Sequence, residues 1–121
     1  MVPGPVQAGA VVALNDDAHV LDQRRRYLER LMYLSGVLSG AGLPVGLPAG
    51  GFYLWAPVPE RVLGGGWSVT EALALEAGLL VSPGEFYGPD GAAFVRVAVV
   101  QPMERLELVG ERLAGRDVMP A

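Results

Sequence analysis

The 121-residue sequence contains no cysteine, no lysine and only one histidine, His19. Without cysteine the chain cannot form disulfides, thiolate-held iron–sulfur clusters or thiolate zinc sites. A lone histidine near a helix start is typical of a surface or capping residue. With no second histidine, no metal site is expected.

Long apolar runs and a basic N-terminal region are also missing. The apolar run over residues 8–14 is too short for a signal peptide or a membrane span. A cytoplasmic protein with no membrane partner is therefore expected, and the absence of cysteine fits that compartment.

Basic residues are too few and too well matched to predict nucleic-acid binding. The net charge is −4 and the isoelectric point about 4.8, whereas a nucleic-acid surface needs clustered cations. The one basic cluster, Arg24 to Arg26, has Asp22 and Glu29 beside it at helical spacing. It indicates a solvated helix face, and no nucleic-acid partner is expected.

Apolar residues, in contrast, are abundant, at 51% of the chain with a mean hydropathy of +0.35. A chain of this length fits one domain with a modest core. Apolar surface left over on so small a domain usually indicates that a partner covers it.

The periodicities predict an α+β fold with the order α-α-β-α-β-β-α and a small, mainly antiparallel sheet of about three strands packed against helices. Helices are predicted over residues 5–14 and 18–39, from a Ser68 to Glu71 capping box to residue 77, and from Pro102 to Gly115. Strands are predicted over residues 52–57, 79–82 and 94–100, and Gly64 to Gly66 are expected to form a flexible joint.

Both faces of the strand over residues 52–57 are apolar, which suggests a strand covered on both sides. Tyr53 and Trp55 are then most simply core or interface aromatics. In the loop over residues 83–93, Phe86 and Tyr87 could present an aromatic surface to a ligand or partner.

Arg96 is the strongest candidate for a binding residue, because it lies in the middle of an apolar strand. Desolvating a full charge costs several kcal/mol unless the charge is paired. A ligand carboxylate could pair with its planar guanidinium through two parallel hydrogen bonds. The alternatives are an internal ion pair, with Glu60, Glu76 or Glu85, and an edge strand whose arginine reaches out to solvent.

Several segments, taken in order and spacing, resemble the C-terminal part of the class I/II aminotransferases, the pyridoxal-phosphate enzymes of fold type I. Within that family the resemblance is greatest to actinobacterial succinyldiaminopimelate aminotransferases. The segments are Pro3-Gly4-Pro5-Val6-Gln7, Asp16-Asp17-Ala18-His19-Val20, Gln23-Arg24-x-Arg26-Tyr27, Gly51-Phe52-Tyr53-Leu54-Trp55, Gly78 to Gly88 and Phe94-Val95-Arg96-Val97-Ala98.

The resemblance implies a small domain over residues 1–121, with N-terminal and interdomain helices over 1–41 and an α+β core over 42–121. It implies that Arg96 binds the α-carboxylate of the amino-acid or 2-oxo-acid substrate. It also implies that pyridoxal 5′-phosphate is the cofactor of the complete enzyme, that a large cofactor-binding domain is a partner, and that a homodimer is possible.

The missing lysine is the departure from the family pattern. Transamination needs a lysine that holds the cofactor as a Schiff base, and arginine cannot replace it because it stays protonated. The chain is therefore expected to be the small domain without its catalytic half, with no catalytic residue, no bound cofactor and no activity alone. Two other interpretations stay open: a stand-alone carboxylate-binding module, and a structural protein that self-associates through exposed apolar surface.

Overall fold

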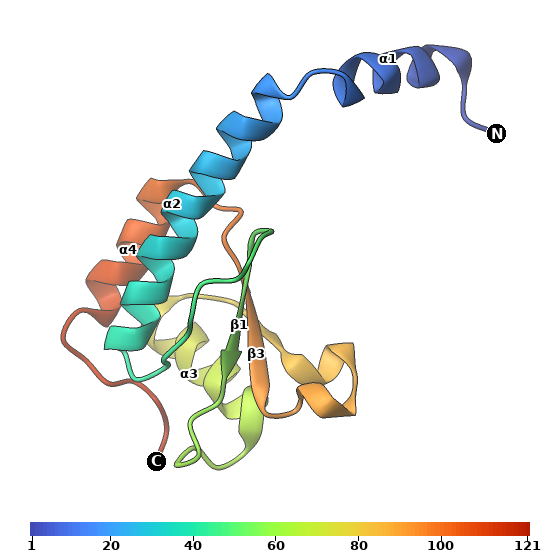
Figure 1. Cartoon of the computed structure of the whole chain (residues 1–121). Coiled ribbons are helices and arrows are strands. Elements are labelled where there is room, and N and C mark those ends of the chain that lie inside the picture. Colours follow the sequence, from blue (N-terminus) through green and yellow to red (C-terminus); the bar gives the residue numbers. More distant parts are fainter.

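The computed structural model describes all 121 residues, which form an N-terminal helical arm and a body in which helices pack on one face of a small sheet (Figure 1). The element order is the predicted one, and the α+β class is confirmed. The helices are α1 (Gly4–Leu14), α2 (Ala18–Gly40), α3 (Gly65–Ala77) and α4 (Met103–Leu113); the strands are β1 (Tyr53–Pro57), β2 (Ser82–Pro83) and β3 (Phe94–Ala98). Two short 3-10 helices, η1 (Gly84–Tyr87) and η2 (Pro89–Gly91), connect β2 to β3.

The sheet has the order β1-β3-β2, and both neighbours run antiparallel to the central strand β3. In this register Trp55 of β1 and Ser82 of β2 lie opposite Arg96 on either side. Pro83 is compatible with β2 because an edge strand does not need every backbone donor.

One face of the sheet packs against the helices and forms a single core. Leu54 and Ala56 of β1 and Val95 and Val97 of β3 are buried on this face by strand alternation. The helical residues that complete the core are Leu31, Leu34, Leu38, Val69, Leu73, Ala77, Leu106, Val109 and Leu113. The apolar residues that recur at helical spacing in α4, namely Leu106, Val109 and Leu113, are all buried, whereas α2 buries residues only from Leu31 onward.

The opposite face of the sheet is open, so the prediction that the 52–57 strand is covered on both sides is wrong within this chain. Trp55 is 41% exposed, and the strand alternates between buried and exposed residues. Helices α2, α3 and α4 all pack on the core face of the sheet, so no α-helix covers the opposite face (Figure 1).

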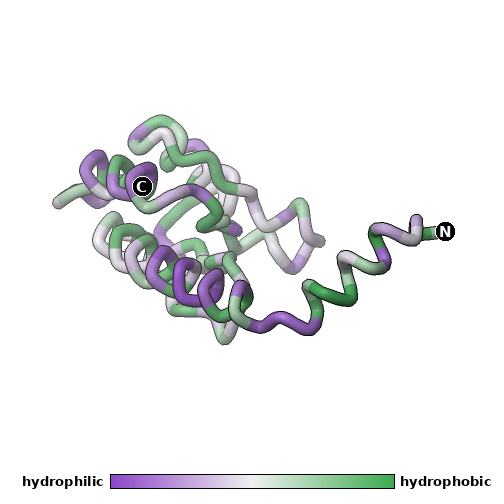
Figure 2. Tube along the Cα trace, turned by 90° about the horizontal axis from the view of Figure 1, so that it is seen from above, coloured by the Kyte–Doolittle hydropathy of each residue, from purple (hydrophilic) through white to green (hydrophobic).

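Helix α1 makes an arm that projects from the body (Figures 1 and 2), and none of its residues is buried. Val6, Val11, Val12 and Leu14 all expose their side chains. No helix of the chain combines the length and the apolar character that crossing a membrane requires.

The predicted capping box is wrong, because the N-cap of α3 is Gly64, four residues before Ser68, and no side chain caps the helix. Gly64 takes the left-handed conformation with φ 91°, and the Gly66 amide donates a hydrogen bond to the Ala92 carbonyl at 3.0 Å. Of the glycines expected to be a flexible joint, Gly64 is therefore the N-cap and Gly65 and Gly66 begin the first turn of the helix, and Ser68 lies inside the helix.

The predicted strand over residues 79–82 is observed only at its end, because β2 spans Ser82–Pro83 and residues 79–81 lie outside the sheet. Gly78 ends α3 in the left-handed conformation, and the Leu79 amide bonds back to the Leu73 carbonyl at 3.1 Å. The helix end thereby uses a backbone donor that a strand ladder would need.

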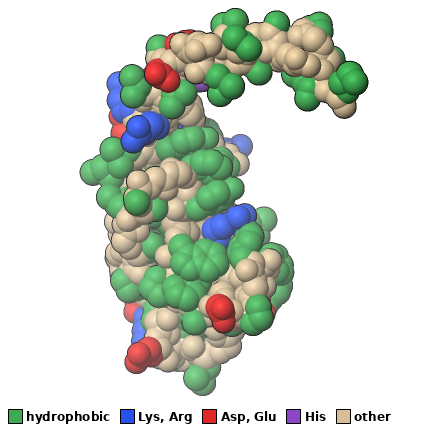
Figure 3. Space-filling model, turned by 45° about the vertical axis from the view of Figure 1, so that its right-hand side comes forward, with side chains coloured by type: hydrophobic (Ala, Val, Ile, Leu, Met, Phe, Trp, Pro, Cys, Tyr) green, Lys and Arg blue, Asp and Glu red, His purple; other side chains and the backbone are tan.

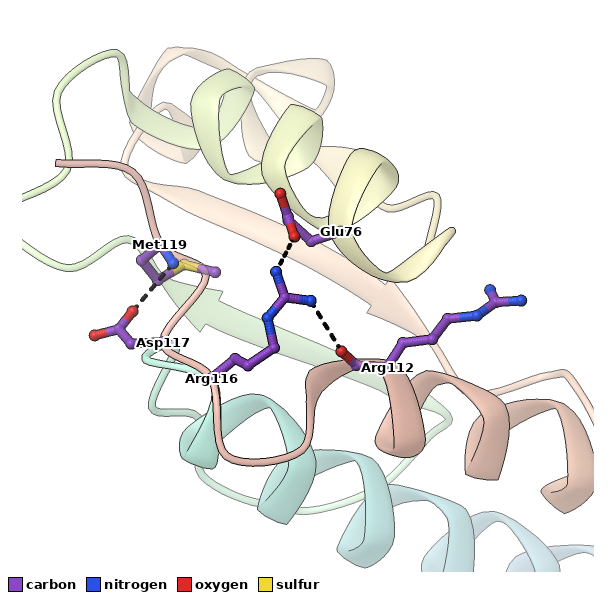
Figure 4. Close-up of polar contacts among 5 residues, drawn as sticks. All are labelled: Glu76, Arg112, Arg116, Asp117 and Met119. Atoms are coloured by element: carbon purple, nitrogen blue, oxygen red, sulfur yellow. Dashed lines mark hydrogen bonds and ion pairs between the residues drawn. The ribbon is translucent and has the colours of Figure 1, made fainter.

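The C-terminal segment after α4 packs back on the body through polar contacts (Figure 4). Arg116 forms an ion pair with Glu76 and donates to the Arg112 carbonyl at 3.2 Å. The Asp117 carboxylate accepts hydrogen bonds from the Arg61 guanidinium and from the Met119 amide, which together hold its pKa below the ordinary value of 3.8.

Candidate carboxylate-binding site

Arg96 lies at the centre of β3, the central strand, and its side chain is half-buried on the open face of the sheet. Strand alternation places it on the same face as Phe94 and Ala98, while Val95 and Val97 point into the core. The charge therefore does not enter the core, but it lies in the middle of an apolar surface.

Two tyrosine rings contact the guanidinium. The Arg96 Cζ atom lies 4.3 Å from the ring centroid of Tyr53 and 4.2 Å from that of Tyr87. Tyr53 begins β1, and Tyr87 ends η1, which follows β2, so the two rings come from the two sides of β3. Each ring face attracts the cation electrostatically.

No carboxylate of this chain pairs with Arg96, and its guanidinium forms no hydrogen bond to the protein. Glu76 is paired with Arg116, as Figure 4 shows, and Glu85 accepts a hydrogen bond from Trp67 Nε1 at 2.8 Å. Glu60 is exposed and has no bond to Arg96. The internal ion pair considered above is therefore absent, and the donors of Arg96 are available to an external carboxylate.

Aromatic rings extend from Arg96 across the open face. Trp55 stacks on Phe94 at 5.4 Å and meets Tyr87 edge-on at 5.9 Å. Figure 3 shows hydrophobic side chains over much of the side of the body that is turned forward there, with few charged groups among them. A bound carboxylate would therefore have a cation as its polar contact and apolar rings around it.

The loop that carries Tyr87 is fixed by the close approach of two glycines. A Cβ on Gly84 would lie 2.1 Å from the Gly91 carbonyl oxygen, and a Cβ on Gly91 would lie 2.2 Å from that of Gly84. Only glycine allows η1 and η2 to pack this tightly. This packing sets the position of Tyr87 over β3.

The sequence identified Arg96 and predicted that Phe86 and Tyr87 could present an aromatic surface to a ligand, but it assigned Tyr53 to the core or an interface. Of Phe86 and Tyr87, only Tyr87 contacts Arg96, since Phe86 meets Trp67 edge-on with ring centroids 5.4 Å apart. Period-two alternation does place Tyr53 and Trp55 on one face of their strand. The sequence does not show that this face also carries Arg96. Only the pairing of β1 with β3 shows it, because Trp55 lies opposite Arg96 and Leu54 lies opposite Val97.

The remaining candidates lie elsewhere. His19 is exposed at the start of α2, 3.6 Å from an Asp16 carboxylate oxygen, and belongs to no cluster of metal-ligating side chains. Arg25 and Arg26 both pair with Asp22, so the basic cluster is a solvated helix face as predicted. Arg96 does not line either of the surface cavities of about 470 and 550 Å³.

Comparison with known proteins gives one consistent family. The family model for aminotransferase class I and II matches residues 1–113. A probable aminotransferase of Mycobacterium tuberculosis is 44% identical over 93% of this chain and 26% of its own length. A 4-dedimethylamino-4-oxo-anhydrotetracycline transaminase of Streptomyces rimosus is 45% identical over 93% of this chain and 30% of its own.

Among solved structures, an aromatic aminotransferase from Pyrococcus horikoshii superposes with a TM-score of 0.77 and 30% identity, over 89% of this chain and 30% of that one. The chain thus spans less than a third of the length of the proteins it matches.

Proposed function

Since this chain belongs to the class I and II aminotransferases, we propose that it forms the C-terminal part of an enzyme that transfers an amino group between an amino acid and a 2-oxo acid, and that Arg96 binds the substrate α-carboxylate. The observation that carries the proposal is a half-buried guanidinium on the central strand that no carboxylate of the chain neutralises. A planar guanidinium offers two parallel donors to a carboxylate, and such charge-assisted bonds are the strong ones.

Enzymes of this family use pyridoxal phosphate, which supplies the electron sink for the chemistry. The residues of this chain do not fit the role of its covalent anchor, because the chain contains no lysine. Arginine stays protonated and is a poor amine nucleophile. In this proposal, cofactor binding and proton transfer therefore belong to a large domain outside these 121 residues.

In this proposal the large domain, or a second subunit of a homodimer, packs against the exposed apolar surfaces of this chain. Helix α1 has no buried residue, and Trp55 on the open face is 41% exposed. Closing that face would exclude water from Arg96 and strengthen its attraction for a carboxylate.

The resemblance to succinyldiaminopimelate aminotransferases makes succinyldiaminopimelate, a molecule that carries several carboxylates, one candidate substrate. Other relatives that match most of this chain are named LL-diaminopimelate aminotransferases, whose named substrate shares that diaminodicarboxylate skeleton. The choice among such acids depends on residues of both domains, whereas the α-carboxylate contact at Arg96 serves all of them.

A stand-alone carboxylate-binding module is the second candidate function. The observation in its favour is that the Arg96 surroundings, with Tyr53 and Tyr87, are formed entirely within this chain. Such a module would bind an amino acid or a 2-oxo acid and perform no chemistry.

Carboxylate binding can be measured on the chain itself. In an NMR titration with 2-oxoglutarate, we expect the Arg96 Nε–H signal to shift with a roughly millimolar Kd, as a few kcal/mol from two exposed charge-assisted bonds implies. Arg96→Ala should abolish binding, while Arg24→Ala, which removes an exposed arginine without an ion pair, should leave it unchanged. Binding that survives Arg96→Ala, or no binding by the unmodified chain, would contradict the role of Arg96.

A further inference from the structure

Tyr53 and Tyr87, called the tyrosine pair below, are held in place by their own neighbours. The Tyr53 ring lies 4.3 Å from Phe52, and the Tyr87 ring lies 5.9 Å from Trp55. Neither phenol hydroxyl has a hydrogen-bond partner in the protein. The pair therefore acts on Arg96 through its rings.

The ring contacts of Arg96 have two consequences for the binding of a ligand. A long arginine side chain loses rotamer freedom when it is ordered, and a side chain that is ordered beforehand loses less on binding. Both ring centroids lie within 4.3 Å of the Arg96 Cζ atom, yet no protein group accepts a hydrogen bond from the guanidinium, so its N–H donors stay free for a ligand.

We infer that the tyrosine pair positions the Arg96 guanidinium so that a substrate carboxylate meets its N–H edge. This inference rests on the proposed function, since it requires Arg96 to be the carboxylate contact. Tyr53 and Tyr87 are positioning residues in this account: they act on the substrate through Arg96, and their hydroxyls are dispensable.

The ring contacts can be tested without any ligand. A proton close to the face of an aromatic ring is shifted upfield, so the Arg96 Nε–H signal of the unliganded chain should lie upfield of the signals of exposed arginines such as Arg24. Tyr53→Leu and Tyr87→Leu should each move it back, whereas Tyr53→Phe and Tyr87→Phe should not.

The positioning role is then tested by titrating each variant with 2-oxoglutarate. Each Leu substitution should weaken binding roughly two- to fivefold, because an Arg96 side chain held by only one ring keeps more rotamer freedom before binding and loses it when the carboxylate binds. The Phe substitutions should restore the original affinity, which a role for the hydroxyls would not allow. Phe86→Leu is the matched control: Phe86 lies on the same 3-10 helix but packs on Trp67 at 5.4 Å, and its loss should change nothing.

The outcomes separate the two proposals. Weaker binding in the Leu variants with rescue by Phe supports the positioning role, provided that the backbone amide spectrum shows each variant folded. Unchanged affinity in folded Leu variants, or an unshifted Arg96 signal in the unliganded chain, overturns it. If the unmodified chain binds no carboxylate while the Arg96 signal is still shifted upfield, the proposed function fails, and the tyrosine pair is reduced to a structural contact.

Discussion

Replacing Arg96 with methionine separates a binding residue from a structural one. If Arg96 serves a ligand, the fold should not depend on its charge. The structure favours this outcome, because the guanidinium has no ion pair and no hydrogen bond within the protein, and its contacts are the rings of Tyr53 and Tyr87.

The expected loss of stability follows from those two contacts. Each exposed cation–π contact is worth about 0.5–1 kcal/mol. Methionine keeps the apolar stem and gains sulfur–aromatic contacts worth about 0.3–1.5 kcal/mol. The free energy of unfolding should therefore change by less than about 1 kcal/mol. Breaking a buried ion pair would instead cost about 3–5 kcal/mol.

Urea and thermal unfolding of the unmodified chain and of Arg96→Met measure the change in the free energy of unfolding. Leu34→Ala serves as the reference variant for a large loss of stability. Leu34 is fully buried, and its truncation should cost about 2–5 kcal/mol. At about 4 °C per kcal/mol for a chain of this size, Leu34→Ala should lower Tm clearly, and Arg96→Met should scarcely move it. An Arg96→Met protein as unstable as Leu34→Ala would refute the reasoning and make Arg96 part of the fold.

Three further predictions concern other features. The purified chain with pyridoxal phosphate, an amino acid and a 2-oxo acid should show no turnover, because no lysine is present; measurable transamination would contradict this. Gly84→Ala should destabilise the fold by about 1–3 kcal/mol and shift the Tyr87 signals, since the added carbon would lie 2.1 Å from the Gly91 carbonyl oxygen; an unchanged unfolding curve would show that the loop can relax. The hydrogen bond from Arg61 lowers the pKa of Asp117 below 3.8 in the folded state, so this carboxylate stabilises the fold above that pH and loses its effect as the pH falls through the lowered pKa. The Tm difference between the unmodified chain and Asp117→Asn should therefore be present at about pH 6 and shrink toward about pH 2, and a difference that does not vary with pH would argue against the assignment.

The local parts of this fold could be predicted from the sequence because they depend on neighbours in the chain. The apolar spacing of Leu106, Val109 and Leu113 gave the buried face of α4, and the alternation from Phe94 to Ala98 gave the strand that carries Arg96. Arg96 was identified for the same reason, because a charged residue between apolar neighbours of one strand can be recognised from the sequence alone.

The features that escaped prediction depend on contacts between distant segments. Ser68 and Glu71 have the spacing of a capping box, but the backbone contact between Gly66 and Ala92 starts the helix earlier. Tyr53 was assigned to the core or an interface because nothing in its own strand shows that β3 lies beside it or in which register. The covering of the open face was predicted from its apolar residues, and this chain alone does not provide it.

The central claim is that these residues form the C-terminal part of an aminotransferase with Arg96 as the substrate anchor. The most direct measurement replaces the matching C-terminal segment of a full-length LL-diaminopimelate aminotransferase relative with residues 1–113 and determines kcat/KM with and without Arg96→Ala. The account predicts an active enzyme whose kcat/KM falls roughly 10- to 150-fold in the Arg96→Ala form, the equivalent of about 1.5–3 kcal/mol, and is unchanged by Arg24→Ala. A graft that is equally active without the Arg96 guanidinium would contradict it.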